Sequence, residues 1–295
     1  MSSPALPESL TGVGVTAIGM AMIRARETAR PDHLYQDPYA QAFVAAAERE
    51  FQDSSADAAD VWATVGRLVE VFYQGRTVGV RMGDDSLREA VAAGRKQIVM
   101  LGAGLDTHAF RLALPSSVHL IELDVPELFA FKERVLADEH ATPTCRRSVV
   151  PADLRGDWSA PLLEAGFQPQ MPTQWVDAGV LAYLLREQAW QVADTITALS
   201  APDSRFGFGY IPLDAMARRV QPVPGAARIM PGMTTQAAEQ ERGLGPDAPE
   251  RLEQTGWSTE FRELAPIAAS YGRPLANPSG GGSIIATRQQ DAGAG

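Results

Sequence analysis

The sequence has few of the residues that form covalent or metal cross-links. Its 295 residues include one cysteine, Cys145, and four histidines. A lone cysteine excludes an internal disulfide, and four scattered histidines supply no familiar structural zinc site. We therefore expect no metal ion, a reducing and hence cytoplasmic compartment, and a fold whose stability comes from its hydrophobic core.

Basic charge and long apolar runs are also scarce. The chain carries 26 Lys and Arg against 36 Asp and Glu, a net charge of −10. Nucleic-acid binding needs clustered basic side chains and is not expected. The apolar residues 10–23 follow a start without Lys or Arg, and they are fewer than the about 20 residues that span a bilayer. We expect a buried helix there, no membrane contact, and a small molecule or a peptide as the partner.

The sequence pattern divides the chain into four segments. Residues 1–95 carry apolar positions at helical spacing, interrupted by the polar residues 51–60. Residues 96–211 alternate between β-rich and helical stretches. Prolines, glycines and methionines in residues 212–256 predict an inserted cap or lid, with an irregular connection as the alternative. Residues 257–288 are expected to add C-terminal strands, and we expect the whole chain to form one domain.

The alternation in the middle of the chain predicts an α/β fold, with a mostly parallel sheet and helices on both faces. The expected strands are residues 97–101, 118–123, 147–152, 174–184 and 204–211. The expected helices between them are residues 126–140 and 186–200. The Gly-rich start of residues 278–288 favours a tight turn before an edge strand over a phosphate loop, because no Lys or helix N-terminus follows it.

The stretch VMLGAGLDTHAFRL joins the first expected strand to a turn and a helix. Gly102 and Gly104 allow a tight turn and the close approach of a ligand to the backbone. The third glycine of a dinucleotide site would stand where Thr107 is, which counts against NAD. The second strand ends in Glu122-Leu-Asp124, about 20 residues past the glycines, where a carboxylate accepts hydrogen bonds from a ribose. This pattern is shared by NAD and S-adenosylmethionine sites.

Several segments together carry a more specific likeness. They are GVGVTAIGMAMIRARET with HLYQDPYA, QIVMLGAGLDTHAFRL, ELDVPELFAFK, VPADLRGDW and PTQWVDAGVLAYL. The sequence resembles, over residues 12 to about 211, the leucine carboxyl methyltransferase-like family of S-adenosylmethionine-dependent methyltransferases. The resemblance implies a Rossmann-like class I methyltransferase fold with additional N-terminal helices.

The resemblance also implies which residues hold the cofactor. Gly102 and Gly104 would face its methionine part, and Asp124 would hold its ribose. Asp153 would accept a hydrogen bond from the adenine amine, and Leu154 would pack on the adenine ring.

Family members pair the methionine carboxylate with an Arg of the helix before the first strand. Arg76 is the first choice for this role and Arg81 the second, because a guanidinium binds a carboxylate through two parallel hydrogen bonds.

Two positions depart from the family pattern. Family members usually have Glu directly before the Gly of the fourth-strand segment, where this chain has Ala178 with Asp177 before it. Because side chains alternate along a strand, Asp177 replaces that Glu only if the backbone bulges. Many bacterial relatives have Arg in place of His108, which we expect to be a capping or surface histidine. Cys145, beside Arg146, is expected to be inert.

The predicted reaction is methyl transfer to oxygen, and no catalytic residue is assigned. A carboxylate has a pKa near 4 and needs no base, so the acceptor expected is the carboxylate of a small metabolite or a peptide. A phenol or enol hydroxyl of secondary metabolism is the alternative, with His33, His108 or a tyrosine as base. Two further classes stay open, an NAD-dependent oxidoreductase and a non-catalytic cofactor-binding protein.

Overall fold

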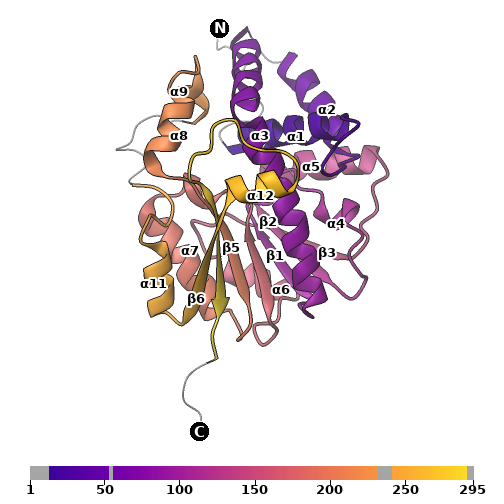
Figure 1. Cartoon of the computed structure of the whole chain (residues 1–295). Helices are drawn as coiled ribbons and strands as arrows, with labels where there is room; N and C mark the ends of the chain where they lie inside the picture. The colour runs from indigo at the N-terminus through magenta and orange to yellow at the C-terminus, as the bar shows by residue number, and fades with distance from the viewer. Residues whose placement is uncertain (1–12, 53–55, 231–240, 291–295) are drawn as a thin grey trace.

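A seven-stranded sheet forms the centre of the molecule (Figure 1). The structure is a computed structural model that describes residues 13–52, 56–230 and 241–290. The strand order is β3-β2-β1-β4-β5-β7-β6. The strands are β1 (Gln97–Leu101), β2 (His119–Asp124), β3 (Arg146–Pro151), β4 (Thr173–Asp177), β5 (Arg205–Tyr210), β6 (Trp257–Glu263) and β7 (Gly282–Arg288). Strand β7 runs antiparallel to both of its neighbours, β5 and β6, whereas β1 to β5 are parallel.

Alternation of side chains along the strands divides the core into two layers. In β1, Ile98 and Met100 pack with the helices that precede and follow this strand, whereas Val99 and Leu101 pack with helices later in the chain. The first layer contains α3 (Ala56–Ala92), α4 (His108–Arg111) and α5 (Pro126–Asp138). The second contains α6 (Ser159–Glu164), α7 (Arg186–Ala198) and α11 (Ala248–Gln254). Both faces of the sheet are therefore covered, as expected.

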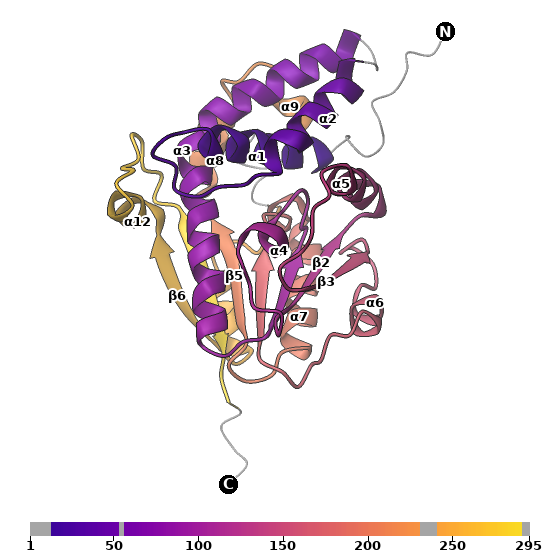
Figure 2. The same cartoon turned by 90° about the vertical axis from the view of Figure 1, so that its right-hand side faces the viewer.

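Additional helices lie beyond the carboxyl ends of the parallel strands (Figure 2). They are α1 (Val13–Thr28), α2 (Ala40–Gln52), α8 (Leu213–Val220) and α9 (Ala226–Ile229). The 37-residue helix α3 joins the two regions, because its first half packs with these helices and its second half runs along the sheet. No helix in the described part of the chain is long and apolar enough to cross a membrane.

The expected strands agree with the structure except at two places. The predicted strand 174–184 ends at Asp177, because Gly179 adopts a φ of +105° and a 3-10 helix, η2 (Leu181–Tyr183), follows. The last strand is not at the edge of the sheet: β7 lies between β5 and β6, and β6 is the edge strand. The short helix α12 (Leu264–Ser270) separates β6 from β7.

The polar segment 51–60 is also shorter than expected. Helix α2 continues to Gln52 and α3 begins at Ala56, so residues 51–52 and 56–60 are helical, and residues 53–55 lie outside the described residues. The predicted cap, 212–256, has two structural parts. Helices α8 and α9 pack against α3, whereas α11 packs against β6 on the second face of the sheet. Between these two parts, residues 231–240 lie outside the described residues.

A buried ion cluster joins β2, β3 and α5. The Nζ of Lys132 donates to Oε2 of Glu122 at 2.7 Å, and both side chains are fully buried. Arg147 donates to the same oxygen at 2.7 Å. Removing one member of a buried ion pair leaves the other charge without compensation in a low-dielectric interior. The cluster therefore fixes α5 on the sheet next to Asp124.

We predict that Lys132→Met lowers the free energy of unfolding by about 3 kcal/mol, because Glu122 then loses one of its two buried partners. Arg134→Met is the control on the same helix: Arg134 pairs with Glu50 at the surface, and its loss should cost less than about 1 kcal/mol. Urea unfolding followed by circular dichroism measures both. Equal losses in the two variants would contradict the assignment.

Candidate functional site

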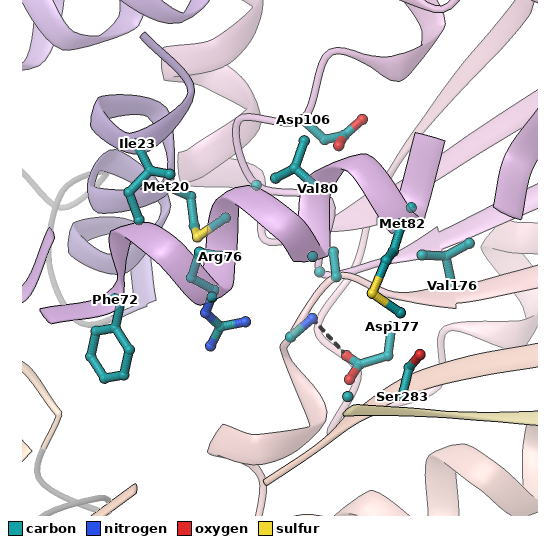
Figure 3. Close-up of a pocket in the computed structure, with 18 of the residues that line it drawn as sticks. Met20, Ile23, Phe72, Arg76, Val80, Met82, Asp106, Val176, Asp177 and Ser283 are labelled. Carbon is teal, nitrogen blue, oxygen red and sulfur yellow. Dashed lines mark hydrogen bonds between the residues drawn. The ribbon is translucent and has the colours of Figure 1, made fainter. Parts of the chain in front are cut away.

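A cavity of about 660 Å³ opens at the carboxyl ends of β1, β2, β4 and β5. The loop after β1 forms one of its walls, and α1, α3 and β7 form others. Figure 3 shows that Arg76 and Met82 project from α3 into this space, and that Asp177 and Ser283 face them from the sheet. In parallel α/β sheets, ligands bind outside the carboxyl ends of the strands. The cavity is therefore the candidate active site.

The two glycines of the loop after β1 both line the cavity. Gly102 has a φ of +64°, and a Cβ there would lie 2.4 Å from the Cβ of Val180. Only glycine therefore lets the loops after β1 and β4 pack together. Gly104, with a φ of +51°, donates its N–H to Oδ2 of Asp124 at 2.6 Å. Side chains other than glycine rarely adopt these angles.

Asp124 lies at the end of β2 and lines the cavity. Its Oδ2 accepts from Gly104 and its Oδ1 from the N–H of Val125 at 2.7 Å. Burial raises the pKa of this carboxyl, and the two N–H groups act in the opposite direction. A carboxylate has about four acceptor positions, so two remain for a diol. Both glycines and this carboxylate thus come together as the sequence predicts.

The structure separates the two arginine candidates. Arg76 lines the cavity (Figure 3), and no hydrogen bond or ion pair joins it to another residue in the described ranges. Arg81 is not among the lining residues. It donates to Asp85 at 3.0 Å and to the carbonyl of Leu34 at 2.9 Å, and its guanidinium lies over Tyr271. Arg76 is therefore the cation available for an anionic group in the cavity.

The structure does not bring the two predicted adenine residues to the cavity. Asp153 and Leu154 follow β3, and neither is among the lining residues. Oδ1 of Asp153 accepts from Nε of Arg155 at 2.9 Å, and this ion pair is exposed. Leu154 is buried among the side chains of the second layer. Their contact with adenine stays a prediction from the resemblance.

Asp177 and Ala178 both line the cavity. Asp177 ends β4, and its Oδ1 accepts from the N–H of Gly179 at 3.0 Å and of Leu181 at 3.2 Å. Burial raises the pKa of Asp177, whereas the backbone N–H groups and the charge of Arg76 lower it. The side chain thus fixes the turn after β4 and presents a carboxylate to the cavity without a bulge in the strand.

His108 is buried, which corrects the prediction of a capping or surface histidine. Its Nδ1 lies 2.5 Å from Oδ2 of Asp106, and its Nε2 lies 3.0 Å from Oδ1 of Asp84. Burial and the charge of Arg111 lower the pKa of His108, but the Asp106 and Asp84 carboxylates together raise it above its usual value. Burial likewise raises the pKa of Asp84, whereas His108 and Arg111 lower it to about 2. Carboxylates beside both ring nitrogens favour the charged form of the imidazole, and that form accepts no proton.

A second buried cluster was not predicted from the sequence. Arg24 of α1 donates to Asp37 at 2.7 Å and to the carbonyl of Leu105 at 2.6 Å. Thr107 donates to the same carboxylate oxygen of Asp37 at 2.8 Å. The cluster ties the loop after β1 to α1. The available signal was Arg24 itself, a charged residue on a helix whose neighbours Ala21 and Ile23 are apolar.

The remaining candidates for chemistry in the described part of the chain are metal ligands and the cysteine. No cluster of three or more His, Cys, Asp and Glu residues there has the arrangement of a metal site. Cys145 is buried, and burial raises the pKa of its thiol. A thiol of raised pKa is a weak nucleophile at neutral pH.

Three features together define a class I methyltransferase. They are the order of the strands, the antiparallel direction of β7, and the glycine loop after β1 that contacts Asp124 at the end of β2. A crystal structure of a protein from Thermobifida fusca, described as a methyltransferase, has the same fold. Its TM-score is 0.55 at 17% identity, and the match covers 97% of each chain. At this identity the match supports the fold alone.

The sequence comparisons identify the family. The leucine carboxyl methyltransferase family model matches residues 17–197. A protein of Frankia alni is 39% identical over 279 residues, which cover 94% of this chain and 95% of the relative. A second protein of that organism is 38% identical over 286 residues, 97% of this chain and 93% of the relative. The chain belongs to the leucine carboxyl methyltransferase family, which confirms the resemblance drawn from the sequence.

We predict that Arg76→Ala weakens the binding of S-adenosylmethionine at least tenfold, because a charged hydrogen bond to its carboxylate is worth about 1.5–3 kcal/mol. Arg76→Lys should recover only part of the loss. Arg81→Ala is the control and should change affinity less than twofold, since Arg81 is held outside the cavity. Isothermal titration calorimetry measures all three. The reverse order of the two alanine variants would assign the role to Arg81.

Proposed function

We propose that this chain is an O-methyltransferase that transfers the methyl group of S-adenosylmethionine to a carboxylate. One observation carries the choice of acceptor. The histidine that lines the cavity, His108, has a carboxylate within 3.0 Å of each ring nitrogen, and these carboxylates favour its charged form, which accepts no proton. A carboxylate acceptor needs none, because it is already ionised at neutral pH.

S-adenosylmethionine is the methyl donor. Both Frankia alni relatives are named as methyltransferases that depend on it. The cavity offers partners for the ribose and the methionine carboxylate of S-adenosylmethionine, whereas the residues predicted for its adenine do not line the cavity. Asp124 keeps acceptor positions for the two ribose hydroxyls, and Arg76 is a cation without an ion pair in the described ranges that fits the methionine carboxylate. Asp153 and Leu154 are proposed for adenine on the resemblance, and Arg81 is not retained as a cofactor residue.

The contribution of the chain to the reaction is position rather than proton transfer. When bound, the cofactor supplies a methyl group on a positively charged sulfur, and its transfer forms an O–CH3 bond while the S–CH3 electron pair stays on sulfur. Gly102 and Gly104 allow a close approach to the loop backbone, and Asp124 and Arg76 fix two ends of the ligand. Orientation of this kind accounts for a large share of the rate of a direct displacement.

A hydroxyl acceptor is the second candidate, and one observation favours it. Asp177 presents a carboxylate of raised pKa to the cavity, and such a group would serve as a base for a phenol. Its Oδ1 is already engaged by two backbone N–H groups. Membership of the methyltransferase family gives no support to an NAD-dependent oxidoreductase or to a non-catalytic binding protein.

We also propose that the cap is formed by α8 and α9, within one domain that includes α1 to α3. Val220 of α8 and Ile229 of α9 pack in the same core as Val65 and Leu68 of α3. Ile229 and Leu68 also line the cavity. Helix α11 belongs to the second face of the sheet instead, where Leu252 is buried. The cap therefore borders the cavity beside α3.

We predict that the methylated product is an ester. Mild alkali should release methanol from it, whereas an aryl methyl ether would survive the treatment. At saturating cofactor and acceptor, the rate should change little between about pH 6 and 8, because a carboxylate acceptor is ionised throughout. Transfer of a labelled methyl group, followed by alkaline hydrolysis, measures the first property. A base-stable product, together with a rate that rises with pH and falls in Asp177→Asn, would identify a hydroxyl acceptor.

A further inference from the structure

The cavity extends beyond the proposed cofactor residues, into the space between α3 and the strands β4, β5 and β7. Figure 3 shows this end, with Met82 of α3 directed toward Val176, Asp177 and Ser283. None of the residues proposed for the cofactor comes from β5 or β7. We call this part of the cavity the slot.

Glycines line both walls of the slot, beside side chains such as Met82 of α3 and Val176 of β4. On α3, Gly75, Gly79 and Gly83 are spaced by four residues and share one face of the helix. On β5, Gly207 and Gly209 are spaced by two residues and share one face of the strand. All five glycines line the cavity. The two backbones therefore face the slot without side chains at these positions.

Three of the five glycines have space beside them, whereas a Cβ at Gly207 would lie 3.3 Å from Cδ1 of Ile285 and a Cβ at Gly75 would lie 3.7 Å from Cδ2 of Leu264. A Cβ at Gly79 or at Gly209 would meet no atom within 4 Å, and a Cβ at Gly83 would meet only Nε2 of His108 at 3.9 Å. Packing between α3 and the sheet therefore does not require glycine at Gly79 or Gly209. Glycine in a helix interior costs about 1 kcal/mol relative to alanine, and glycine inside a strand weakens the strand as well. A ligand that approaches both backbones closely accounts for Gly79, Gly83 and Gly209, and packing against Ile285 accounts for Gly207.

A buried side chain on the sheet wall lacks a partner. Gln174 of β4 lines the cavity and is 1% exposed. Its Oε1 has no hydrogen-bond partner in the described part of the chain, and its Nε2 makes one long contact of 3.4 Å with the carbonyl of Trp175. A buried amide oxygen without a partner is costly. A ligand N–H or O–H at the inner end of the slot would satisfy it.

The slot and the cofactor region meet at the end of β4. Val176 pairs with Gly207 in the sheet, and Gly209 pairs with Ser283. The glycines of β5 thus lie next to Asp177, the last residue of β4, which together with Ala178 lines the cavity opposite the loop after β1. A ligand in the slot would therefore present its outer edge to the proposed methyl donor and its inner edge to Gln174.

We propose that the slot binds the methyl acceptor, and that the acceptor is a flat aromatic or conjugated carboxylic acid with a hydrogen-bond donor on the edge away from its carboxylate. The inference rests on the proposed function for the reaction, but the binding site stands on the geometry alone. Two facing backbones with glycines at these positions fit a planar ring system, whose atoms make van der Waals contact on both faces at about 3.5–4 Å. Met82 adds a flexible thioether that packs well against aromatic rings.

The test uses 6-hydroxy-2-naphthoate, which is planar and carries a hydroxyl opposite its carboxylate. Its affinity is measured by fluorescence titration of the full chain, with and without S-adenosylhomocysteine. The wild-type chain should bind it more tightly than 2-naphthoate, decanoate or a leucine-terminated tripeptide. Gln174→Leu should remove the advantage of 6-hydroxy-2-naphthoate over 2-naphthoate.

Gly79→Leu should weaken naphthoate binding at least tenfold, because the new side chain projects into the slot, while S-adenosylmethionine binding changes less than twofold. Gly66→Leu is the matched control. Gly66 lies on the same helix, has no atom within 4 Å of a built Cβ, and does not line the cavity. It should change neither affinity. Circular dichroism and thermal melting establish that both variants are folded.

Tighter binding of the tripeptide than of any naphthoate, or naphthoate binding that Gly79→Leu leaves unchanged, would overturn the proposal. The naphthoates are also titrated without any cofactor. The slot is therefore tested even if the wild-type chain fails to bind S-adenosylmethionine, a result that would contradict the proposed function and not the slot.

Discussion

The loop after β1, which we propose as the cofactor loop, depends on charges that are buried behind it. Arg24 and Asp37 form an ion pair that is almost completely excluded from solvent, and Thr107 of the loop donates to the same carboxylate. On the other side of the loop, Asp84 of α3 receives two hydrogen bonds from Arg111 at 2.6 and 2.8 Å. Buried charges are stable only with partners in good geometry. The loop therefore has its shape only when α1 and α3 are docked, and these helices are part of the binding site.

The docking of α1 and α3 explains why the cavity has two parts, a rigid part at the loop after β1 and a part whose walls vary in the size of their side chains. The loop after β1 and the end of β2 are rigid, since Asp124 is itself held by two backbone N–H groups. These two rigid segments suit a ligand that a whole class of enzymes shares, the proposed cofactor. The remaining walls come from α3, β5 and the cap, where side chains differ in size from glycine to phenylalanine. These walls determine which acceptor binds. The proposed cofactor site beside them can keep the same residues for different acceptors.

Much of the fold followed from local patterns in the sequence. The apolar run 97–101 and the alternation after it predict β1 and the parallel core, and the glycine spacing predicts that Gly102 and Gly104 lie close to Asp124. The errors have physical causes. The predicted strand runs past Asp177 because apolar residues continue into η2. The prediction puts β7 at the edge because the order of strands in the sequence does not show that β7 lies between β5 and β6. Partners such as Arg24 and Leu105 are 81 residues apart, so no local pattern connects them, and His108 was misjudged because its two carboxylates become neighbours only after folding.

The central claim is that buried polar contacts outside the cavity set the cofactor affinity. Thr107→Val tests it most directly, because this side chain is buried, does not line the cavity, and keeps its shape when its hydroxyl is lost. The control is Thr173→Val, an equally buried threonine whose partners lie at the amino end of β4. Calorimetric titration with S-adenosylmethionine should show at least fivefold weaker binding in Thr107→Val, consistent with about 1 kcal/mol or more for a lost buried hydrogen bond, and unchanged binding in Thr173→Val. Wild-type affinity in Thr107→Val would contradict the account.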